Sequence, residues 1–479
     1  MSSVAAENAT VQLNGKDYPS LADGKYDVVI CGTGLTECIL SGLLCKKGMK
    51  VLHTDRNDFY GSACASLTLS NLFKKFKNRE PTEEEFTRLG KDRYCNVDLV
   101  PKLILGAGQL VKIILYTKTE HYLEFNAVDG SFAAQGGKPS KVPSTASEAV
   151  KTPLVGFFQK RRLRGLLQFL AGYDAKDTKT HQGQDLNKVT SRELFKYFSC
   201  DDNTAEFVGH CMALMPDNTY LDEPACKMVD ACQLYVESLT RYGGISPYLY
   251  PNYGLGGLPE GFSRLSAVYG GTFMLMRDVH EIVRNEDGVV VGVTSKNPEE
   301  KDAEEAAVAN IVVGDPSYFG KDRCELRGHV VRSICILEKS IPNLGQDCRS
   351  CQIIIPQGQC KRNHDIYITM IGEKLHCTPE GRYVVTISTT VETSVETALQ
   401  ELEPAIKLIG AKNILERFDE VSPFYVPKKD LERDNCFCSR SYDATSNFES
   451  ILDDVFGLYE RITGERLVMD EDAKEGKKS

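Results

Sequence analysis

The N-terminal part of the chain alternates short apolar runs with glycine-containing turns. The run Tyr26–Cys31 is apolar, as expected for a parallel strand that is buried on both faces. A Gly-Thr-Gly turn at residues 32–34 follows, and the apolar spacing over Leu35–Lys46 predicts a helix. A second strand over Lys50–His53 leads to Asp55. This order predicts a βαβ unit at the start of a Rossmann-type sheet.

The pattern changes to helical spacing between Val150 and Leu239. Apolar residues recur there three and four positions apart, so each group falls on one face of a helix. Such stripes predict an all-helical insert of about 100 residues. The stripes are Leu163, Leu166, Leu167 and Leu170; Phe207, Val208, Cys211, Met212 and Met215; and Met228, Cys232, Tyr235 and Leu239.

Strand-like sequence returns after the helical stretch and predicts a β extension of the first sheet. The Pro/Ser-rich segment Lys138–Ala149 and the Gly/Tyr-rich segment Arg241–Gly257 are interpreted as connections into and out of the insert. The predicted strands are Gly288–Ser295, Val308–Val313, His329–Leu337, Gln352–Ile355, Ile366–Ile371 and Tyr383–Thr389.

These patterns predict an α/β (α+β) fold: a flavoprotein-like Rossmann-type domain with a β-sheet extension, and an inserted all-helical domain. Domain I is expected to comprise residues 25–139 and 241–460, and domain II residues 140–240. The polar residues 1–24 are expected to form a disordered extension, and the charged residues 461–479 a flexible tail.

Composition excludes some classes of function. The chain of 479 residues has 57 Lys and Arg against 67 Asp and Glu, and a net charge of −10 weighs against nucleic-acid binding. Its 17 cysteines are scattered, and residues 1–24 do not resemble a secretory signal, so we expect free thiols and a cytoplasmic protein. The most apolar stretch, Val28–Cys45, contains Glu37 and three glycines, which argues against a membrane span.

The turn after the first strand has the layout of a dinucleotide-binding site. Gly32 permits the tight turn, Gly34 lets a pyrophosphate approach the helix N-terminus, and Asp55 is placed for ribose hydroxyls. The third glycine position of the motif holds Glu37, whose carboxylate would repel a pyrophosphate. The turn is therefore either an FAD or NAD site or a scaffold that has lost its cofactor. Glu37 favours the second interpretation, with no cofactor and with Gly32, Gly34 and Asp55 as vestiges.

Catalytic and metal-binding patterns are otherwise scarce. The sequence has no HExxH, no G-x-S-x-G and no P-loop. Cys436-x-Cys438 and Cys348-x-x-Cys351 have the spacing of metal or redox pairs, but neither has a partner pair at zinc-finger spacing. We interpret them as buried structural cysteines and predict no metal and no catalytic residue.

A basic cluster at the start of the helical stretch is open to two interpretations. The segment KRRLR at residues 160–164 follows Phe157 and Phe158 after one residue, Gln159. Cations beside aromatic residues attract anionic surfaces, but such a run is more often the solvated face of an amphipathic helix. The sequence alone favours the solvated face.

Longer stretches resemble one family. Residues 27–51 (DVVICGTGLTECILSGLLCKKGMKV), with the signature LTECILSG, and residues 53–61 (HTDRNDFYG) strongly resemble the Rab GDP-dissociation inhibitors, in which a Glu at position 37 is usual. The resemblance runs from about residue 25 to about residue 460. Other matching stretches are residues 96–102 (NVDLVPK), 141–145 (KVPST), 246–250 (SPYLY), 258–271 (LPEGFSRLSAVYGG), 352–356 (QIIIP), 388–393 (STTVET) and 436–444.

The resemblance implies a binding protein and no enzyme. Members of the family bind prenylated Rab-family small GTPases in the GDP state, slow GDP release, extract the GTPase from membranes and recycle it in vesicle transport. Domain I would carry a Rab-binding platform, and domain II would hold the geranylgeranyl lipid. A cytoplasmic monomer with transient membrane contact is implied as well.

The resemblance also assigns residues position by position. Rab-binding positions match Tyr60, Lys91, Arg93, Arg264, Thr272 and Met274, and effector-loop positions match Arg241, Tyr242 and Ser246. Gly257 stands where the family pattern YGLGELP has Glu, and the loop Arg241–Ser246 is one residue longer than the pattern. Both departures bear on affinity or selectivity for Rab.

The lining of the lipid site is predicted from helical phase and not from a motif. If the stripes separate, Leu167, Phe207, Cys211 and Met215 are the expected pocket residues. Periodicity alone favours a plain bundle whose stripes bury one another, and the resemblance favours a pocket.

Two other functions stay open. Rab escort proteins, which present Rab to geranylgeranyltransferase, share the signature but are usually much longer. A flavin-dependent oxidoreductase would use the same scaffold with its cofactor bound. A geranylgeranylation assay separates the first from an inhibitor, and the yellow colour of a flavoprotein separates the second.

Overall fold

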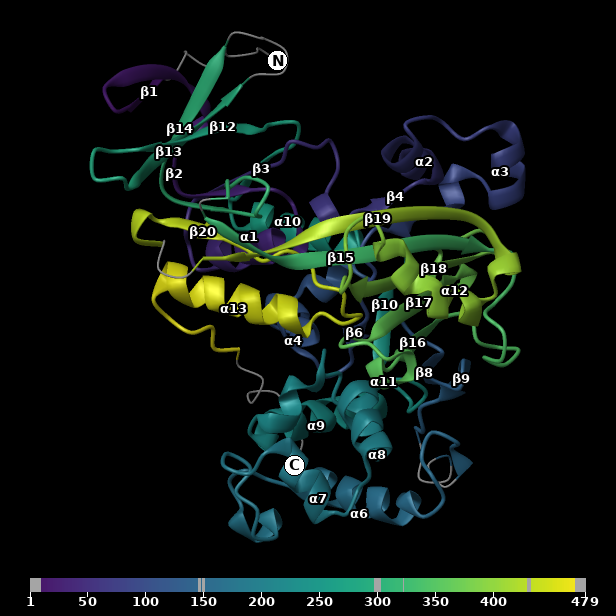
Figure 1. Cartoon of the computed structure of the whole chain (residues 1–479). Coiled ribbons are helices and arrows are strands. Elements are labelled where there is room, and N and C mark those ends of the chain that lie inside the picture. The colour runs from purple at the N-terminus through teal and green to yellow at the C-terminus, as the bar shows by residue number, and fades with distance from the viewer. Residues whose placement is uncertain are drawn as a thin grey trace.

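The computed structural model describes residues 10–144, 148, 151–296, 303–321, 323–428 and 432–469. Figure 1 shows sheets in the upper part of the molecule and a group of helices below them. Mixed sheets and helices in this order confirm the predicted fold class.

A Rossmann-type sheet forms the first part of the molecule. β2 (Lys16–Cys31) lies between β3 (Val51–Thr54) and β14 (Glu304–Gly314), and the three strands are parallel. The predicted βαβ unit is therefore confirmed. The sheet is completed by β11 (Thr272–Met274), β13 (Val290–Lys296), β12 (Val279–Arg284), β20 (Cys436–Cys438) and β1 (Thr10–Leu13).

Helix α1 (Leu35–Lys46) is enclosed by the protein. α10 (Gly257–Val268) and α13 (Glu449–Thr463) both pack against it, and every residue from Leu35 to Cys45 is buried. This burial explains the apolar character of the segment without a bilayer. Among the residues the structure describes, we find no helix with the length and apolarity needed to cross a membrane.

The N-terminal segment is more ordered than the sequence predicts. Disorder over residues 1–24 is wrong for residues 10–24, which belong to β1 and β2; residues 1–9 lie outside the described ranges. Val11 and Leu13 are buried against Ala306 of β14. The alternating apolar positions of β1 therefore find their partner some 290 residues away in sequence, where local polarity gives no signal.

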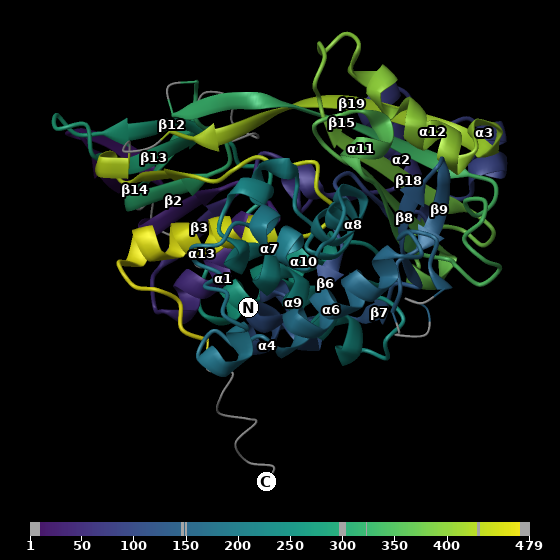
Figure 2. The same ribbon diagram turned by 60° about the horizontal axis from the view of Figure 1, so that its bottom comes forward.

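A second sheet extends the first domain. Its strand order is β19-β15-β18-β17-β16-β8-β9, and the long β15–β19 pair crosses the middle of the molecule in Figure 1 and runs along its upper side in Figure 2. The strands of this sheet are β19 (Ile414–Pro427), β15 (Cys324–Leu337), β18 (Tyr383–Thr390), β17 (Ile366–Gly372), β16 (Cys351–Ile355), β8 (Gly130–Gln135) and β9 (Lys138–Lys141). Four of the six predicted strands overlap β15, β16, β17 and β18, and the other two overlap β13 and β14 of the first sheet.

Two segments expected to be connections contain strands. The segment 138–149 begins with β9, which pairs with β8. The segment 241–257 contains β10 (Tyr248–Pro251), which is buried and pairs with β6 (Ile104–Leu105) and β7 (Phe125–Ala127). Proline and glycine in these stretches mark strand ends and edges.

Helices occupy the inserted stretch, as its spacing predicts. Members of all three apolar stripes are buried in one common core, which includes Leu166, Val208 and Met228. The second stripe departs from regular α-helix, because η5 (Phe207–Met212) is a π-helix. The other helices are α6 (Gln159–Gly172), α7 (Ser191–Tyr197), α8 (Asp202–Glu206) and α9 (Ala225–Arg241).

A buried ion pair joins the helices to the second sheet. His210 Nδ1 of η5 lies 2.8 Å from Asp365 Oδ2, and both side chains are fully buried. Nε2 of His210 lies 3.0 Å from Asn218 Oδ1. Burial opposes protonation of His210, but the hydrogen bond and charge of Asp365 outweigh it and raise the pKa of His210. The Gly358 N–H also donates to Glu206 Oε1 of α8 at 2.8 Å. The His210–Asp365 pair and this hydrogen bond therefore hold the helices against the second sheet.

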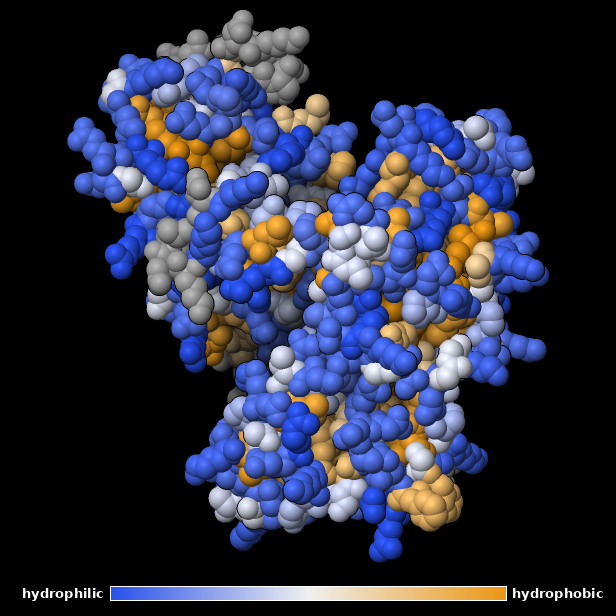
Figure 3. Space-filling view, viewed as in Figure 1, coloured by the Kyte–Doolittle hydropathy of each residue, from blue (hydrophilic) through white to orange (hydrophobic). Residues whose placement is uncertain are grey.

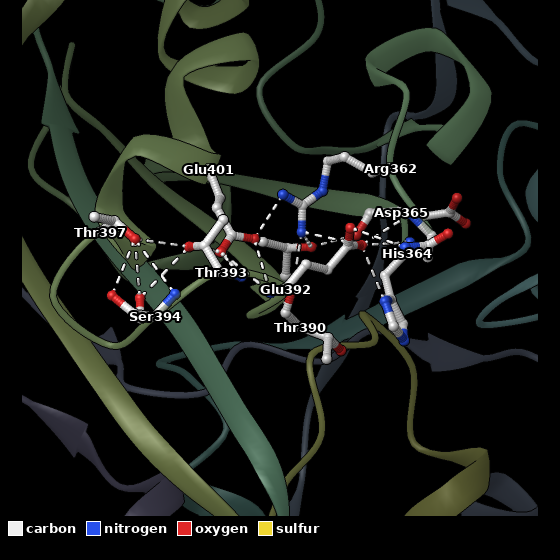
Figure 4. Close-up of polar contacts among 11 residues, drawn as sticks. Arg362, His364, Asp365, Thr390, Glu392, Thr393, Ser394, Thr397 and Glu401 are labelled. Atoms are coloured by element: carbon white, nitrogen blue, oxygen red, sulfur yellow. Dashed lines mark hydrogen bonds and ion pairs between the residues drawn. The ribbon is translucent and has the colours of Figure 1, made fainter.

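A polar network holds the Asp365 loop in place (Figure 4). Arg362 Nη1 lies 2.6 Å from Glu401 Oε2, and its Nη2 donates to the Thr390 carbonyl at 2.9 Å. The Thr389 hydroxyl donates to the Asp365 carbonyl at 2.8 Å. The loop before β17 is thus fixed from β18, which presents the Asp365 carboxylate to His210.

We expect His210→Ala to destabilise the protein, because it leaves the Asp365 carboxylate buried without its partner. Removing one member of a buried pair costs about 3–5 kcal/mol. Urea unfolding should therefore show a lower midpoint for His210→Ala and little change for Lys188→Ala, whose ion pair with Asp185 is exposed. Equal urea midpoints for the two variants would show that the buried pair does not stabilise the packing of the helices against the second sheet.

Candidate functional site

The glycine turn has the backbone of a dinucleotide site. Gly32 has φ +93°, and a Cβ there would lie 3.0 Å from Asp315 Oδ2, so glycine is required. Gly34 is the N-cap of α1, and a Cβ at Gly34 would meet Glu37 Oε2 closely. The space from which a pyrophosphate approaches the helix is therefore taken by the Glu37 side chain.

Glu37 is a buried part of this site. Ser439 Oγ donates to Glu37 Oε1 at 2.6 Å, and only 2% of the residue is exposed. Burial, with the charge of Asp315 as a second cause, raises the pKa of Glu37 to about 8. The neutral form of this side chain is thus favoured, and the side chain occupies space that a pyrophosphate would need.

The other groups of the motif are also used by the protein. The N–H of Leu35, at the start of α1, donates to the Tyr442 hydroxyl at 3.1 Å. Asp55 Oδ2 accepts from the Thr33 N–H at 2.6 Å, from the Thr33 hydroxyl at 2.5 Å and from the Ser62 hydroxyl at 2.8 Å. These residues do not fit a dinucleotide: the helix N-terminus and the ribose-binding acid both have partners within the chain. A cleft of about 820 Å³ lies beside them and is lined by Gly34, Glu37 and Tyr442 among others.

Three of the predicted Rab-binding residues lie together at the end of β3. Thr272 and Met274 belong to β11, which pairs with β3. The Tyr60 ring lies 6.2 Å from the Phe273 ring of β11. Residues about 200 positions apart are thus brought to the same end of the sheet, and we call the partly exposed residues Tyr60, Thr272 and Met274 the platform.

Arg264 extends the platform along α10. It follows Ser263, is exposed, and its guanidinium lies 6.0 Å from the Tyr122 ring centre. Gly257 begins the same helix, and a Cβ there would have only an ordinary contact of 3.7 Å with Leu123. Glycine is therefore not required at position 257, and a larger side chain fits.

Lys91 and Arg93 lie in a neighbouring segment. Both are exposed, and the Arg93 guanidinium lies 4.6 Å from the Tyr94 ring centre. In the described part of the chain neither cation hydrogen-bonds or stacks with Tyr60. Their segment is connected to the platform by the pairing of β4 (Ser66–Leu67) with β5 (Val97–Asp98).

Asp98 is a buried residue that organises this region and was not among the predicted site residues. Its carboxylate accepts from the hydroxyls of Ser66 and Tyr250, and from the Leu255 N–H at 2.9 Å. Burial raises the pKa of Asp98 to about 6, although these bonds oppose the rise. Asp98 thereby joins β5 to the segment that enters α10. Its place within NVDLVPK, a matching stretch, was the available signal.

The predicted effector loop is only partly exposed. Arg241 ends α9 and is exposed, and Tyr242 is 41% exposed. Ser246 is buried, and its Oγ accepts from the Tyr248 N–H at 3.3 Å. Arg241 and Tyr242 can meet a partner directly, whereas Ser246 needs a movement of the loop.

The four predicted lipid-pocket residues are not brought together. Phe207 and Cys211 line one cavity of about 20 Å³ between η5 and β8, which has room for about one water and not for an acyl chain. Leu167 and Met215 are partly buried elsewhere against the core. An acyl-chain site at Phe207 and Cys211 therefore requires the helices to open.

The cysteine pairs are structural in character. Cys436, Cys438, Cys348 and Cys351 are buried, as predicted. Within the described residues, no group of three or more His, Cys, Asp or Glu side chains has the arrangement of a metal site.

Fold and site together define a flavoprotein-type scaffold whose dinucleotide groups are occupied by its own side chains. The family model for GDP dissociation inhibitors matches residues 22–474, and the chain belongs to this family. This confirms the predicted family. The flavin-dependent oxidoreductase alternative is not supported.

Individual relatives agree along nearly the whole chain. Rab GDP dissociation inhibitor beta of Rattus norvegicus is 45% identical over 451 residues, which cover 93% of this chain and 97% of that protein. The Rab GDP-dissociation inhibitor of Saccharomyces cerevisiae is 45% identical over 450 residues, with the same coverage. The crystal structure of Rab GDI from Plasmodium falciparum has a TM-score of 0.86 and 40% identity, and covers 93% of this chain and 99% of that one.

A more distant likeness concerns the fold alone. An oxidoreductase from Methanosarcina mazei has a TM-score of 0.55 at 12% identity, with 91% of this chain and 100% of that one covered. The shared scaffold agrees with the Rossmann-type sheet and says nothing about chemistry.

We expect Glu37→Gln to weaken the pH dependence of stability. The pKa of Glu37 is raised from 4.5 to about 8 in the folded state, so the free energy of unfolding falls as pH rises between these values. Glutamine resembles the protonated acid and does not titrate. Urea midpoints measured between pH 4.5 and pH 8 should fall less for Glu37→Gln than for the wild type. Parallel curves for the two proteins would contradict a raised pKa at Glu37.

Proposed function

We propose that this protein binds prenylated Rab-family small GTPases in the GDP state, slows their GDP release, extracts them from membranes and recycles them. Membership of the GDP dissociation inhibitor family supports the proposal. The structural observation that supports it most is the platform, where the partly exposed Tyr60 lies against Phe273 of β11.

The platform has the character of a protein-binding surface. Tyr60 and Arg264 are of the residue types that dominate interface energetics. The Phe273 ring packs against Tyr60, which reduces the side-chain entropy lost on binding. Lys91 and Arg93 are exposed cations, and we propose that they face an acidic part of the GTPase.

The proposed function involves no catalysis. The relatives are named as inhibitors, and the groups that would bind a dinucleotide are engaged within the chain. We place the protein in the cytoplasm as a monomer, with transient contact to membranes. A Rab escort function would make prenyl transfer to Rab by geranylgeranyltransferase depend on this chain, and the inhibitor function would not.

The lipid is proposed to bind among the helices after they open. Phe207 and Cys211 lie on a π-helix, a conformation that is frequent at functional sites. Conversion of η5 toward α-helical geometry would shift both side chains relative to β8. The geranylgeranyl chain has about 20 carbons, and its burial is worth about 0.8 kcal/mol per methylene relative to water, so an opened apolar pocket can replace the bilayer as its environment.

We expect Tyr60→Ala and Arg264→Ala each to weaken binding of Rab–GDP at least about tenfold, because interface anchors of these types contribute about 2 kcal/mol or more. Titration calorimetry with Rab–GDP measures the loss, and Rab–GTP gives the state preference. Tyr197→Ala and Arg192→Ala, both exposed in the helical domain, serve as controls.

The platform assignment fails if both variants keep wild-type affinity. Gly257→Glu gives the opposite test on the same surface. Position 257 accepts a side chain and carries Glu in the family pattern, so this change should strengthen Rab–GDP binding without lowering the melting temperature.

We expect Cys211→Phe to reduce extraction of prenylated Rab–GDP from liposomes and to leave binding of unprenylated Rab–GDP unaltered. The larger side chain fills the space that opening would give to the lipid. Because the closed site has little free volume, overpacking should also cost about 1–3 kcal/mol of stability.

Cys211→Ala is the matched control and should extract normally. Equal loss of both activities in Cys211→Phe, or loss of neither, would place the lipid elsewhere. A parallel urea titration shows whether Cys211→Phe is folded under the assay conditions.

A further inference from the structure

The tip of the helical domain bears two exposed aromatic side chains. Phe157 and Phe158 are 82% and 85% exposed, the highest values among the large apolar residues the structure describes. Their rings meet edge to face at 5.6 Å and stand just before α6. In Figure 3 an apolar patch stands out on the polar surface of this domain, at the end where α6 lies in Figure 1.

Stability of the helical domain does not explain these side chains. The buried face of α6 consists of Leu163, Leu166, Phe169 and Leu170, which already provide its contact with the core. Full burial of a phenylalanine is worth about 1.5–3 kcal/mol, and both residues forgo this gain in the free protein.

The segment that carries the aromatic pair is rich in cations. Residues 149–173 contain five Lys and Arg and no Asp or Glu, although the whole chain has a net charge of −10. Arg161, Arg162 and Arg164 are exposed on α6. Lys160 and Arg161 lie in its first turn, where the helix dipole disfavours cations by about 0.3–1 kcal/mol each. The cluster is thus placed against the local electrostatics of its own helix.

We propose that Phe157, Phe158 and the cations of residues 160–164 form a docking surface for an anionic membrane. Exposed phenylalanine beside Arg and Lys is the composition of interfacial membrane anchors, in which the rings enter the acyl boundary and the cations meet lipid phosphates. Each cation near an anionic bilayer contributes about 1 kcal/mol. The segment 149–173 has no acidic residue of its own, which makes it complementary to acidic lipid.

The position of the tip agrees with a membrane partner. In Figure 1 the strands and helix of the platform lie in the upper part of the molecule and α6 at its lower end. The proposed GTPase-binding surface and the tip are therefore well separated in this view. This inference rests on the proposed function, since a carrier that removes a lipid-anchored protein must bring its helical domain to the bilayer.

The chain contains no tryptophan, which permits a direct test. Phe158→Trp introduces a single tryptophan at the tip, whose emission can be excited selectively. Tyr197→Trp, at a position that is 51% exposed on α7, is the matched control. With vesicles of phosphatidylcholine and phosphatidylserine, emission of the first protein should shift to the blue and that of the second should not. Phosphatidylcholine alone should give a much smaller shift, and salt should weaken the response.

Vesicle flotation then tests the residues themselves, without any Rab. Phe157→Ser with Phe158→Ser, and Arg161→Glu with Arg162→Glu, should each reduce binding to phosphatidylserine vesicles at least about tenfold. Lys176→Glu with Lys179→Glu, exposed beyond the other end of α6, should have little effect. Wild-type flotation by both tip variants, or no blue shift at residue 158, would overturn the proposal.

Binding of unprenylated Rab–GDP in solution separates this inference from the proposed function. Tip variants that bind Rab–GDP normally but fail to float support the membrane surface. If the wild type binds Rab–GDP but not vesicles, the membrane surface is wrong and the proposed function stands. If tip variants lose Rab–GDP binding instead of flotation, the tip contacts the GTPase and the membrane assignment is wrong.

Discussion

The Asp55 carboxylate at the end of β3 accepts five hydrogen bonds, and the organisation of the platform depends on them. Three come from Thr33 and Ser62 to one oxygen, and two from the backbone and side chain of Asn57 to the other. The Asp55 N–H also donates to the carbonyl of Met274 in β11, and the Asp55 carbonyl accepts from the Arg277 N–H, which follows β11. One buried acid thus fixes the glycine turn, the segment that carries Tyr60, and β11, which together define a binding surface.

The glycine turn has the backbone of a dinucleotide site, but side chains of the chain itself contact its groups. A helix N-terminus and buried turn N–H groups must be satisfied, and a scaffold that loses its pyrophosphate would leave them without partners. Tyr442 and Ser439, from the segment after β20, reach into the site and contact the Leu35 N–H and Glu37. The C-terminal part of the chain therefore completes the site. Burial raises the pKa of Glu37 and so favours its neutral form there.

Local periodicity predicted the βαβ unit, the later strands and the helical stretch, because each depends on residues near one another in sequence. The elements that the sequence did not predict are held by contacts with residues far away in sequence. β1 is held by Ala306, and β19, whose residues include several charges, is paired along its length with β15. Helical phase placed Phe207 and Cys211 on one face correctly, but it does not tell what the face packs against, and here that is β8. Tyr60 and Arg264 were found only through the family resemblance.

The energies involved constrain how such a carrier works, if it has the function proposed. A prenyl chain gains about as much from a bilayer as from an apolar protein pocket, so lipid transfer alone drives extraction in neither direction. Contacts at the platform must supply the difference. Membrane docking must in turn stay weak, because a strong anchor would hold the loaded carrier on the bilayer. Two phenylalanines and a few cations, each worth about 1 kcal/mol near acidic lipid, are on the scale of a contact that forms and breaks readily.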